Sequence, residues 1–174
     1  MPTRVELLEP GEAIPAGRGY VGVTDPSPHA ELFFPHVDSC LALALILTNN
    51  QLIGGHVPQQ WFGEKGKNLG GSIKKVVDLM VANQLRVGGE VKLLIAAGHG
   101  NWWHDDAGTE VGTAMAQWGG ESNYMGVVTD EQAPKGVDVL VKPTSLTITR
   151  CHDGKQRIYN NLDNTKSVFK SSAF

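Results

Sequence analysis

The sequence predicts an α+β fold with a mixed β-sandwich-like core and helices packed outside. Predicted strands outnumber predicted helices and do not alternate regularly with them, as they would in a parallel α/β fold. Glycine occurs 21 times, mostly between apolar runs, which is typical of short elements joined by tight turns. The chain has 174 residues, of which 41% are hydrophobic, enough for one core. We therefore expect one domain over 1–174, with an irregular extension containing a short strand over 1–30.

The central predicted element is a β-hairpin. Residues 40–48, CLALALILT, form a continuous apolar run that favours a strand buried on both faces, although the pattern alone also allows a helix. Asn49-Asn50 favours a turn, because asparagine adopts the left-handed conformation readily. The second arm would cover 51–57. Short strands bounded by turn residues are also expected at 20–24, 31–34, 90–97, 126–129, 137–141, 146–150 and 157–160.

The clearest predicted helix covers 72–87. Ser72 can cap its start, apolar residues recur at helical spacing, and Gly88-Gly89 can end it. A second helix is expected at about 109–118.

Charge and hydropathy exclude several classes of partner. The formal net charge is −3 and the basic residues are scattered, so we expect no nucleic-acid partner. No apolar segment reaches the length of a membrane-spanning helix, and the N-terminus lacks the apolar stretch of a signal peptide. We therefore expect a cytoplasmic protein without membrane insertion.

The chain has two cysteines, Cys40 and Cys151, too few for a disulfide scaffold or for a structural zinc site on their own. Cys40 opens the first arm of the predicted hairpin and His56 lies near the end of the second, so both fall at the same end. A neighbouring imidazole shifts a thiol toward the reactive thiolate. Cys151 is interpreted as structural, because it and His152 would face opposite ways along a strand.

The register of the hairpin decides whether the two side chains meet. With a two-residue turn at Asn49-Asn50, His56 would oppose Leu43, and Cys40 would point to the other face. For the two side chains to share a face, the pairing of the two arms must shift by one residue. We predict a bulge at Gly54-Gly55, while a three-residue turn, or a thiol placed in the bend before the strand, would serve equally.

These residues carry a family resemblance. V-D-S-C at 37–40, the apolar strand, and I-G-G-H at 53–56 followed by Pro58 resemble the core of the chemoreceptor glutamine deamidase CheD. The same core occurs in bacterial deamidating toxins such as the cytotoxic necrotizing factors and the Burkholderia lethal factor group. The resemblance covers 36–160 in order of elements, but only the Cys–His hairpin in sequence.

The resemblance implies a cysteine-dependent protein glutamine deamidase that converts a target glutamine to glutamate through a thioester. Cys40 would be the nucleophile and His56 the general base and acid, with no cofactor and no metal. The partner would be a protein bearing a surface glutamine, and we expect a monomer. The enzyme would act on chemoreceptors, or it would be a toxin or effector delivered to a host cytosol. The divergent N-terminus and Asp38 favour the toxin branch slightly.

Two positions depart from the family pattern. Asp38 replaces a glycine, and Phe34 stands where several members place a threonine that orients the histidine. A backbone carbonyl, Asp38, Ser39 or His36 would have to orient the imidazole instead. Backbone N–H groups near Asp38, Ser39 and Leu41 are the candidates for holding an oxyanion.

A loop rich in polar and aromatic residues, GHGNWWHDD at 98–106, offers further candidates. His99, Trp102 and Trp103 are predicted substrate contacts, although the tryptophans would equally suit the core. Two alternatives to the deamidase stay open. One is a metal-dependent hydrolase using His99, His104, Asp105 and Asp106. The other is a non-catalytic protein-binding module on the same fold.

Overall fold

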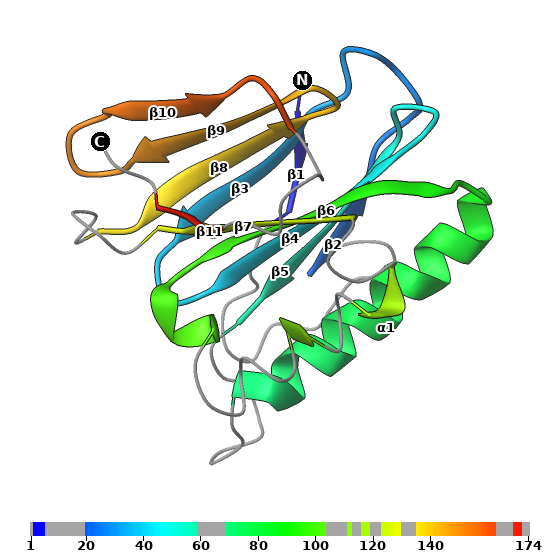
Figure 1. The fold of residues 1–174 in the computed structure, drawn as a ribbon, viewed down its shortest axis with the longest axis horizontal. Helices are drawn as coiled ribbons and strands as arrows, with labels where there is room; N and C mark the ends of the chain where they lie inside the picture. The colour runs from blue at the N-terminus through cyan, green and yellow to red at the C-terminus, as the bar shows by residue number, and fades with distance from the viewer. Residues whose placement is uncertain are drawn as a thin grey trace.

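The computed structural model consists of two β-sheets and one long helix (Figure 1). It describes residues 2–5, 20–58, 69–103, 111–112, 116–118, 123–129, 135–162 and 169–171. The predicted mixed α+β class is confirmed, whereas the single-domain assignment stays a prediction. The chain is helical at 111–112 and 116–117, within the predicted second helix, whose other residues lie outside the described ranges.

Sheet A has the strand order β1-β3-β8-β9-β10. Its only parallel pairing among the described strands is between β1 and β3. The strands are β1 (Thr3–Arg4), β3 (Leu32–Val37), β8 (Val137–Lys142), β9 (Ser145–Arg150) and β10 (Gln156–Tyr159).

Sheet B has the order β11-β7-β6-β4-β5-β2. It is mixed, because β7 runs parallel to both β6 and β11 while the other pairs are antiparallel. The strands are β2 (Val21–Val23), β4 (Leu41–Leu47), β5 (Leu52–Val57), β6 (Val91–Gly98), β7 (Tyr124–Val128) and β11 (Phe169–Ser171), and a short 3-10 helix, η1 (Gly100–Trp103), follows β6.

The continuous apolar run of β4 is explained by its position in the middle layer. Sheet A covers one face of sheet B, and helix α1 (Leu69–Val87) covers the other (Figure 1). All seven β4 residues are buried. Alternate residues face two different cores: Ala42, Ala44 and Ile46 pack between the sheets, whereas Leu41, Leu43, Leu45 and Leu47 pack toward α1. A strand buried on both faces does not show alternation in sequence.

Helix α1 begins earlier than the sequence predicted. It starts at Leu69, so Ser72 lies within its first turn rather than at its N-cap. The two glycines at 70–71 have low helix propensity, which is why the pattern favoured a later start. The predicted end is confirmed: Gly88 has a φ of 72° and its N–H donates to the Gln84 carbonyl at 2.9 Å. In the described part of the chain, no helix has the length and apolarity needed to cross a bilayer.

Strand β3 extends beyond the predicted end at residue 34, through Pro35 to Val37. Phe34 pairs with Val139 and Val37 with Val137, so two residues of β3 oppose Asp138 alone. This arrangement is a β-bulge, one of the few places where a sheet tolerates proline. The second bulged residue, His36, has a φ of 51°.

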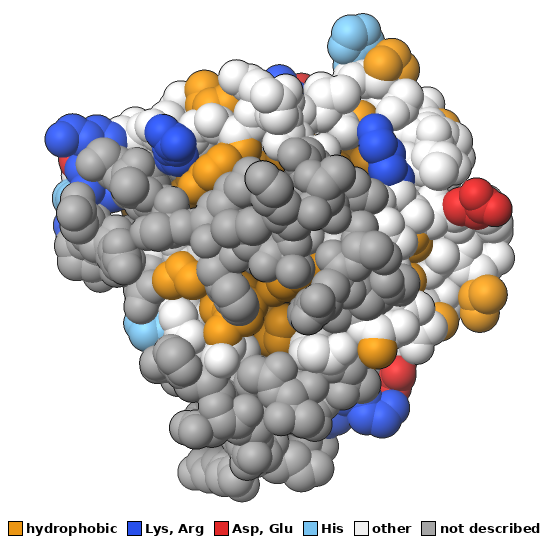
Figure 2. Space-filling model, viewed as in Figure 1, with side chains coloured by type: hydrophobic (Ala, Val, Ile, Leu, Met, Phe, Trp, Pro, Cys, Tyr) orange, Lys and Arg blue, Asp and Glu red, His pale blue; other side chains and the backbone are white. Residues whose placement is uncertain are grey.

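The described lysine and arginine side chains lie in separate places around the rim of the face shown in Figure 2. Hydrophobic side chains lie nearer its middle, beside residues that are not described. The described residues of this face therefore form no continuous basic surface of the kind that binds a polyanion.

Candidate active site

A three-residue turn joins the two arms of the hairpin. The Leu47 N–H donates to the Gln51 carbonyl at 2.9 Å, and the Asn50 N–H donates to the Leu47 carbonyl at 3.0 Å. Asn50 has a φ of 67°, the left-handed conformation expected of the last residue in such a turn. The Asn49 side chain accepts the Gln51 N–H at 3.0 Å. The turn therefore contains one residue more than the two-residue turn considered from the sequence.

The turn supplies the register slip, and the bulge predicted at Gly54-Gly55 is absent. The ladder from Leu41–Val57 to Ile46–Leu52 runs without a shift. The two glycines instead permit close packing on both faces of β5. A Cβ at Gly54 would lie 2.9 Å from Phe34 Cζ, and one at Gly55 would lie 2.5 Å from Met80 Sδ. Neither position has room for a side chain unless its neighbours move.

The register places Cys40 and His56 on the same face of sheet B. His56 is opposite Ala42, and Cys40 precedes Ala42 by two residues, so the alternation of a strand directs both side chains between the sheets. Both are buried, with exposed fractions of 8% for Cys40 and 1% for His56. Cys40 belongs to the inter-sheet core together with Phe34. In a regular ladder such diagonal neighbours have Cα atoms about 7–8 Å apart.

His56 contacts three separate segments of the chain, two through its imidazole and one through its backbone. Its Nδ1 lies 3.0 Å from the Val5 carbonyl oxygen, and its backbone N–H donates to the Tyr20 carbonyl at 2.7 Å. The Phe34 ring meets it edge-on, with ring centroids 6.1 Å apart. A carbonyl oxygen only accepts, so we assign the ring proton to Nδ1. The buried Nε2 then carries the lone pair and is the basic nitrogen.

A backbone carbonyl is therefore the group that orients His56, one of the options left open by the sequence. Val5 follows β1, and its N–H donates to the Phe33 carbonyl at 2.8 Å, which attaches this segment to β3. Phe34, at the position of the family's threonine, gives an aromatic contact only. Asp38 and Ser39 lie in the bend before β4, Asp38 exposed and Ser39 half-buried.

The bend that carries the thiol is fixed by the end of β6 and by η1. The indole Nε1 of Trp102 donates to the Ser39 carbonyl at 2.9 Å. A Cβ at Gly98 would lie 2.8 Å from the Cys40 carbonyl oxygen, so only glycine permits this approach. Trp102 is 1% exposed. It thus supports the bend from the core instead of offering an exposed contact.

The two other predicted substrate contacts lie nearby. His99 is half-buried and directly follows Gly98, which pairs with Leu41, so it lies beside the thiol bend. Trp103 is half-buried and donates to the Tyr124 hydroxyl at 2.7 Å. Burial raises the pKa of Tyr124 to about 12, so its hydroxyl stays neutral at physiological pH. His104, Asp105 and Asp106, on which the metal-hydrolase alternative depends, lie outside the described residues.

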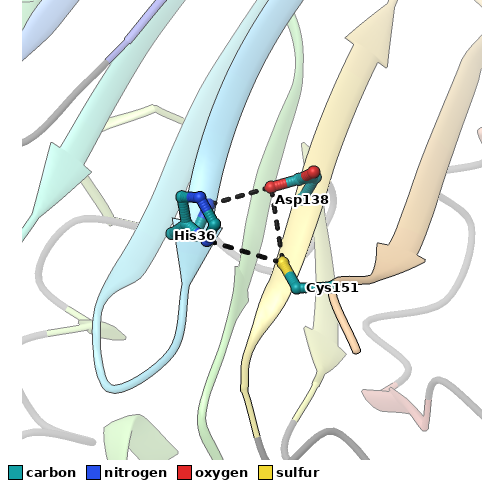
Figure 3. A group of neighbouring side chains, drawn as sticks. All are labelled: His36, Asp138 and Cys151. Carbon is teal, nitrogen blue, oxygen red and sulfur yellow. Dashed lines mark hydrogen bonds between the residues drawn. The ribbon is translucent and has the colours of Figure 1, made fainter. Parts of the chain in front are cut away.

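The structure also brings together a cluster that the sequence did not predict. The Cys151 Sγ lies 3.7 Å from His36 Nδ1 and 3.5 Å from Asp138 Oδ1 (Figure 3). Burial, Asp138 and Asp38 raise the pKa of the Cys151 thiol to about 11. His152 follows Cys151 in sequence, but its Nε2 lies 3.6 Å from Asp153 Oδ2. Pro35 within a strand-like segment was the available sign that β3 bulges here and turns His36 outward.

No protein-family model matches the chain, and no curated protein matches its sequence.

Proposed function

We propose that this protein is a cysteine-dependent glutamine deamidase that acts on other proteins, with Cys40 as nucleophile and His56 as general base and acid. The observation that supports the proposal best is the contact between His56 Nδ1 and the Val5 carbonyl, 3.0 Å long, on a histidine that shares the inter-sheet face with Cys40. A fixed tautomer with a basic Nε2 is what a thiol–imidazole pair requires.

The reaction uses only these groups and water. His56 Nε2 takes the thiol proton, and the Cys40 sulfur bonds to the carboxamide carbon of the substrate. The C–N bond then breaks, and ammonia leaves with the proton returned by His56. Water, deprotonated by the same nitrogen, attacks the thioester and releases a glutamate side chain and the thiol. No net oxidation or reduction occurs, so no redox cofactor is needed.

Burial between two sheets by itself disfavours a free thiolate. The proposed reaction therefore needs the His56 imidazole on the same face as Cys40 to accept the thiol proton and to balance the charge of the thiolate. Backbone N–H groups near Ser39 and Leu41 are close enough in sequence to serve an oxyanion at the attacked carbon. The bend is fixed by Trp102, which keeps these groups in place between turnovers.

We propose further that the chain shares the core of CheD and the deamidating toxins, because the bend that carries Cys40 leads into a buried central strand and a hairpin returns His56 to the same end. We propose that the target is either a bacterial chemoreceptor or a host protein. The reaction would place a new negative charge on that target, which can act as a switch.

The test is mass spectrometry of proteins incubated with the full chain. A bacterial lysate and a human cell lysate are treated separately with wild type, with Cys40→Ser and with His29→Gln, an exposed surface histidine that serves as the matched control. Wild type and His29→Gln should raise the mass of specific glutamine sites by about one unit, as amide becomes acid. Cys40→Ser should leave those sites unchanged.

The two lysates also separate the branches of the proposal, because conversion in only one of them identifies the class of target. Equal conversion by Cys40→Ser, or no converted glutamine in either lysate, would contradict the proposal.

A further inference from the structure

Three neighbouring strands of sheet A bring one polar side chain each to the same end of its outer face. The bulge in β3 sets His36 against Asp138 of β8, and the His36 N–H donates to the Asp138 carboxylate at 3.0 Å. Cys151 directly follows β9, and its N–H donates to the Gly136 carbonyl at 3.1 Å, which continues the β8–β9 ladder. The strand alternation places Cys151 and Asp138 on one face.

The three side chains converge on a common point, as Figure 3 shows. One ligand atom from each of His36, Asp138 and Cys151 lies within 4.8 Å of the others. They offer a nitrogen, an oxygen and a sulfur, the donor atoms that zinc takes in proteins. The inward residues of the same strands, Val137 and Val139, are fully buried and keep the strands in place.

The two separations that involve sulfur agree with tetrahedral coordination. With Zn–S of about 2.3 Å and Zn–N or Zn–O of about 2.0–2.1 Å, tetrahedral angles put sulfur roughly 3.5–3.6 Å from either other ligand. The observed separations from Cys151 Sγ are 3.7 Å to His36 Nδ1 and 3.5 Å to Asp138 Oδ1. The His36 nitrogen and the Asp138 oxygen lie within 4.8 Å of one another, and coordination would bring them to about 3.3 Å.

We propose that His36, Asp138 and Cys151 form a binding site for a zinc-class divalent cation on the outer face of sheet A. The fourth position faces solvent and is open to water, because His36 is exposed and the other two side chains are half-buried. The site is separate from the thiol chemistry of Cys40 and requires none of its groups.

Binding replaces a proton by a metal ion. The Cys151 thiol is neutral at physiological pH, since its pKa is raised to about 11. On binding, the S–H proton leaves to solvent and the thiolate, the His36 nitrogen and the Asp138 oxygen bond to the cation. In the metal-free protein, burial and the negative charges of Asp138 and Asp38 hold the proton on sulfur, and these charges then stabilise the cation instead.

The test uses cobalt(II) as a spectroscopic substitute for zinc. The full-length protein, freed of metal by a chelator and dialysed, is titrated with cobalt(II) while absorption is recorded. We expect a thiolate-to-cobalt charge-transfer band in the near ultraviolet that saturates at one equivalent and disappears when zinc is added. The band identifies a bound sulfur directly and does not depend on any activity.

Matched variants identify which sulfur and which nitrogen bind. Cys151→Ser should lose the band, and His36→Gln should weaken zinc affinity by at least about tenfold, since losing even an outer-shell partner costs 10–100-fold. Cys40→Ser and His152→Gln change the other cysteine and the neighbouring histidine, and both should keep the band and the affinity. All these variants can be checked for folding by their metal-free melting curves.

Two results would overturn the proposal. One is wild-type protein that gives no charge-transfer band at saturating cobalt(II). The other is Cys151→Ser that keeps the band while Cys40→Ser loses it, which would move the metal to the inner cysteine. Because Cys40→Ser destroys the proposed deamidase but should retain the metal, failure of one proposal is distinguishable from failure of the other.

Discussion

The two cysteines of this protein lie in opposite environments. Cys40 lies between the sheets on the same face as His56, and a neutral carbonyl contacts the far nitrogen of that imidazole. Cys151 lies on the outside of sheet A, and a carboxylate contacts its sulfur directly. In the proposed deamidase the Val5 carbonyl would orient the base, whereas burial and the Asp138 carboxylate raise the pKa of the Cys151 thiol, which keeps its proton. Nearness to a histidine is therefore not enough to predict a reactive thiol.

The largest expected effect is on the inner histidine. His56→Gln keeps a hydrogen-bonding side chain of similar reach but removes the proton acceptor, so kcat for deamidation should fall by about 10²–10⁴. His29→Gln, on the surface, should match wild type. The measurement is the rate of glutamate formation on an identified target. A loss of less than about tenfold would mean that another group is the base.

Detaching the orienting carbonyl should have the next largest effect. Val5→Pro removes the N–H that holds this segment to the Phe33 carbonyl, and so lets the Val5 oxygen move away from His56. We expect kcat to fall by about tenfold to a hundredfold, because misplacing a catalytic group by about 1 Å has effects up to this size. KM should change little, since Val5 is fully buried.

The matched control for this prediction is Val5→Ala, which keeps the backbone N–H and should lose much less activity. Equal losses for the two variants would assign the effect to the missing methyl groups, not to the carbonyl.

A smaller effect is expected from adding a methyl group at Gly54, on the face of β5 that lies between the sheets. Gly54→Ala would bring a Cβ to 2.9 Å from Phe34 Cζ and 3.0 Å from Val5 Cγ2, both in contact with His56. Overpacking of this kind costs about 1–3 kcal/mol of unfolding free energy. Gly112→Ala meets nothing within 4 Å and should not destabilise. Chemical denaturation measures the difference, and zinc affinity of the outer site should be unaffected by either change.

The smallest expected effect concerns the reactivity of the outer thiol. Asp138 raises the pKa of Cys151, so Asp138→Asn should lower that pKa and increase the thiolate fraction at any pH below it. Alkylation of Cys151 by iodoacetamide at pH 8, with a chelator present, should become severalfold faster, since each pKa unit changes the thiolate fraction tenfold. Peptide mapping reports both cysteines in one sample, and the Cys40 rate should not change. Slower alkylation of Cys151 in Asp138→Asn would contradict the claim that Asp138 raises the pKa of this thiol.

The elements were predictable where their signal is local. Apolar patterns and nearby turn residues predict the two arms β4 and β5. They also predict the apolar face of α1 and its end at Gly88. The residue pairing between β4 and β5 could not be predicted, because the two asparagines suit either a two-residue or a three-residue turn.

The contacts that complete each site were not predictable for different physical reasons. The group on His56 is a main-chain oxygen, and every residue carries one, so no residue type marks Val5. The outer cluster joins His36, Asp138 and Cys151 from three separate strands. Their convergence depends on one bulge and on the left-handed φ of His36, neither of which a single sequence specifies.

The three-residue turn at 48–50 has a consequence for how this protein can change length. Opposite residues of an antiparallel pair share a face, so closure of the turn by Leu47 and Gln51 keeps His56 opposite Ala42 whatever the number of residues between them. Deleting one residue of β5 between Gln51 and His56 would instead exchange the faces and turn the imidazole toward Met80 of α1, where Gly55 now packs. A change of length within 48–50 should therefore be tolerated, whereas a single-residue deletion within β5 should act as an active-site mutation.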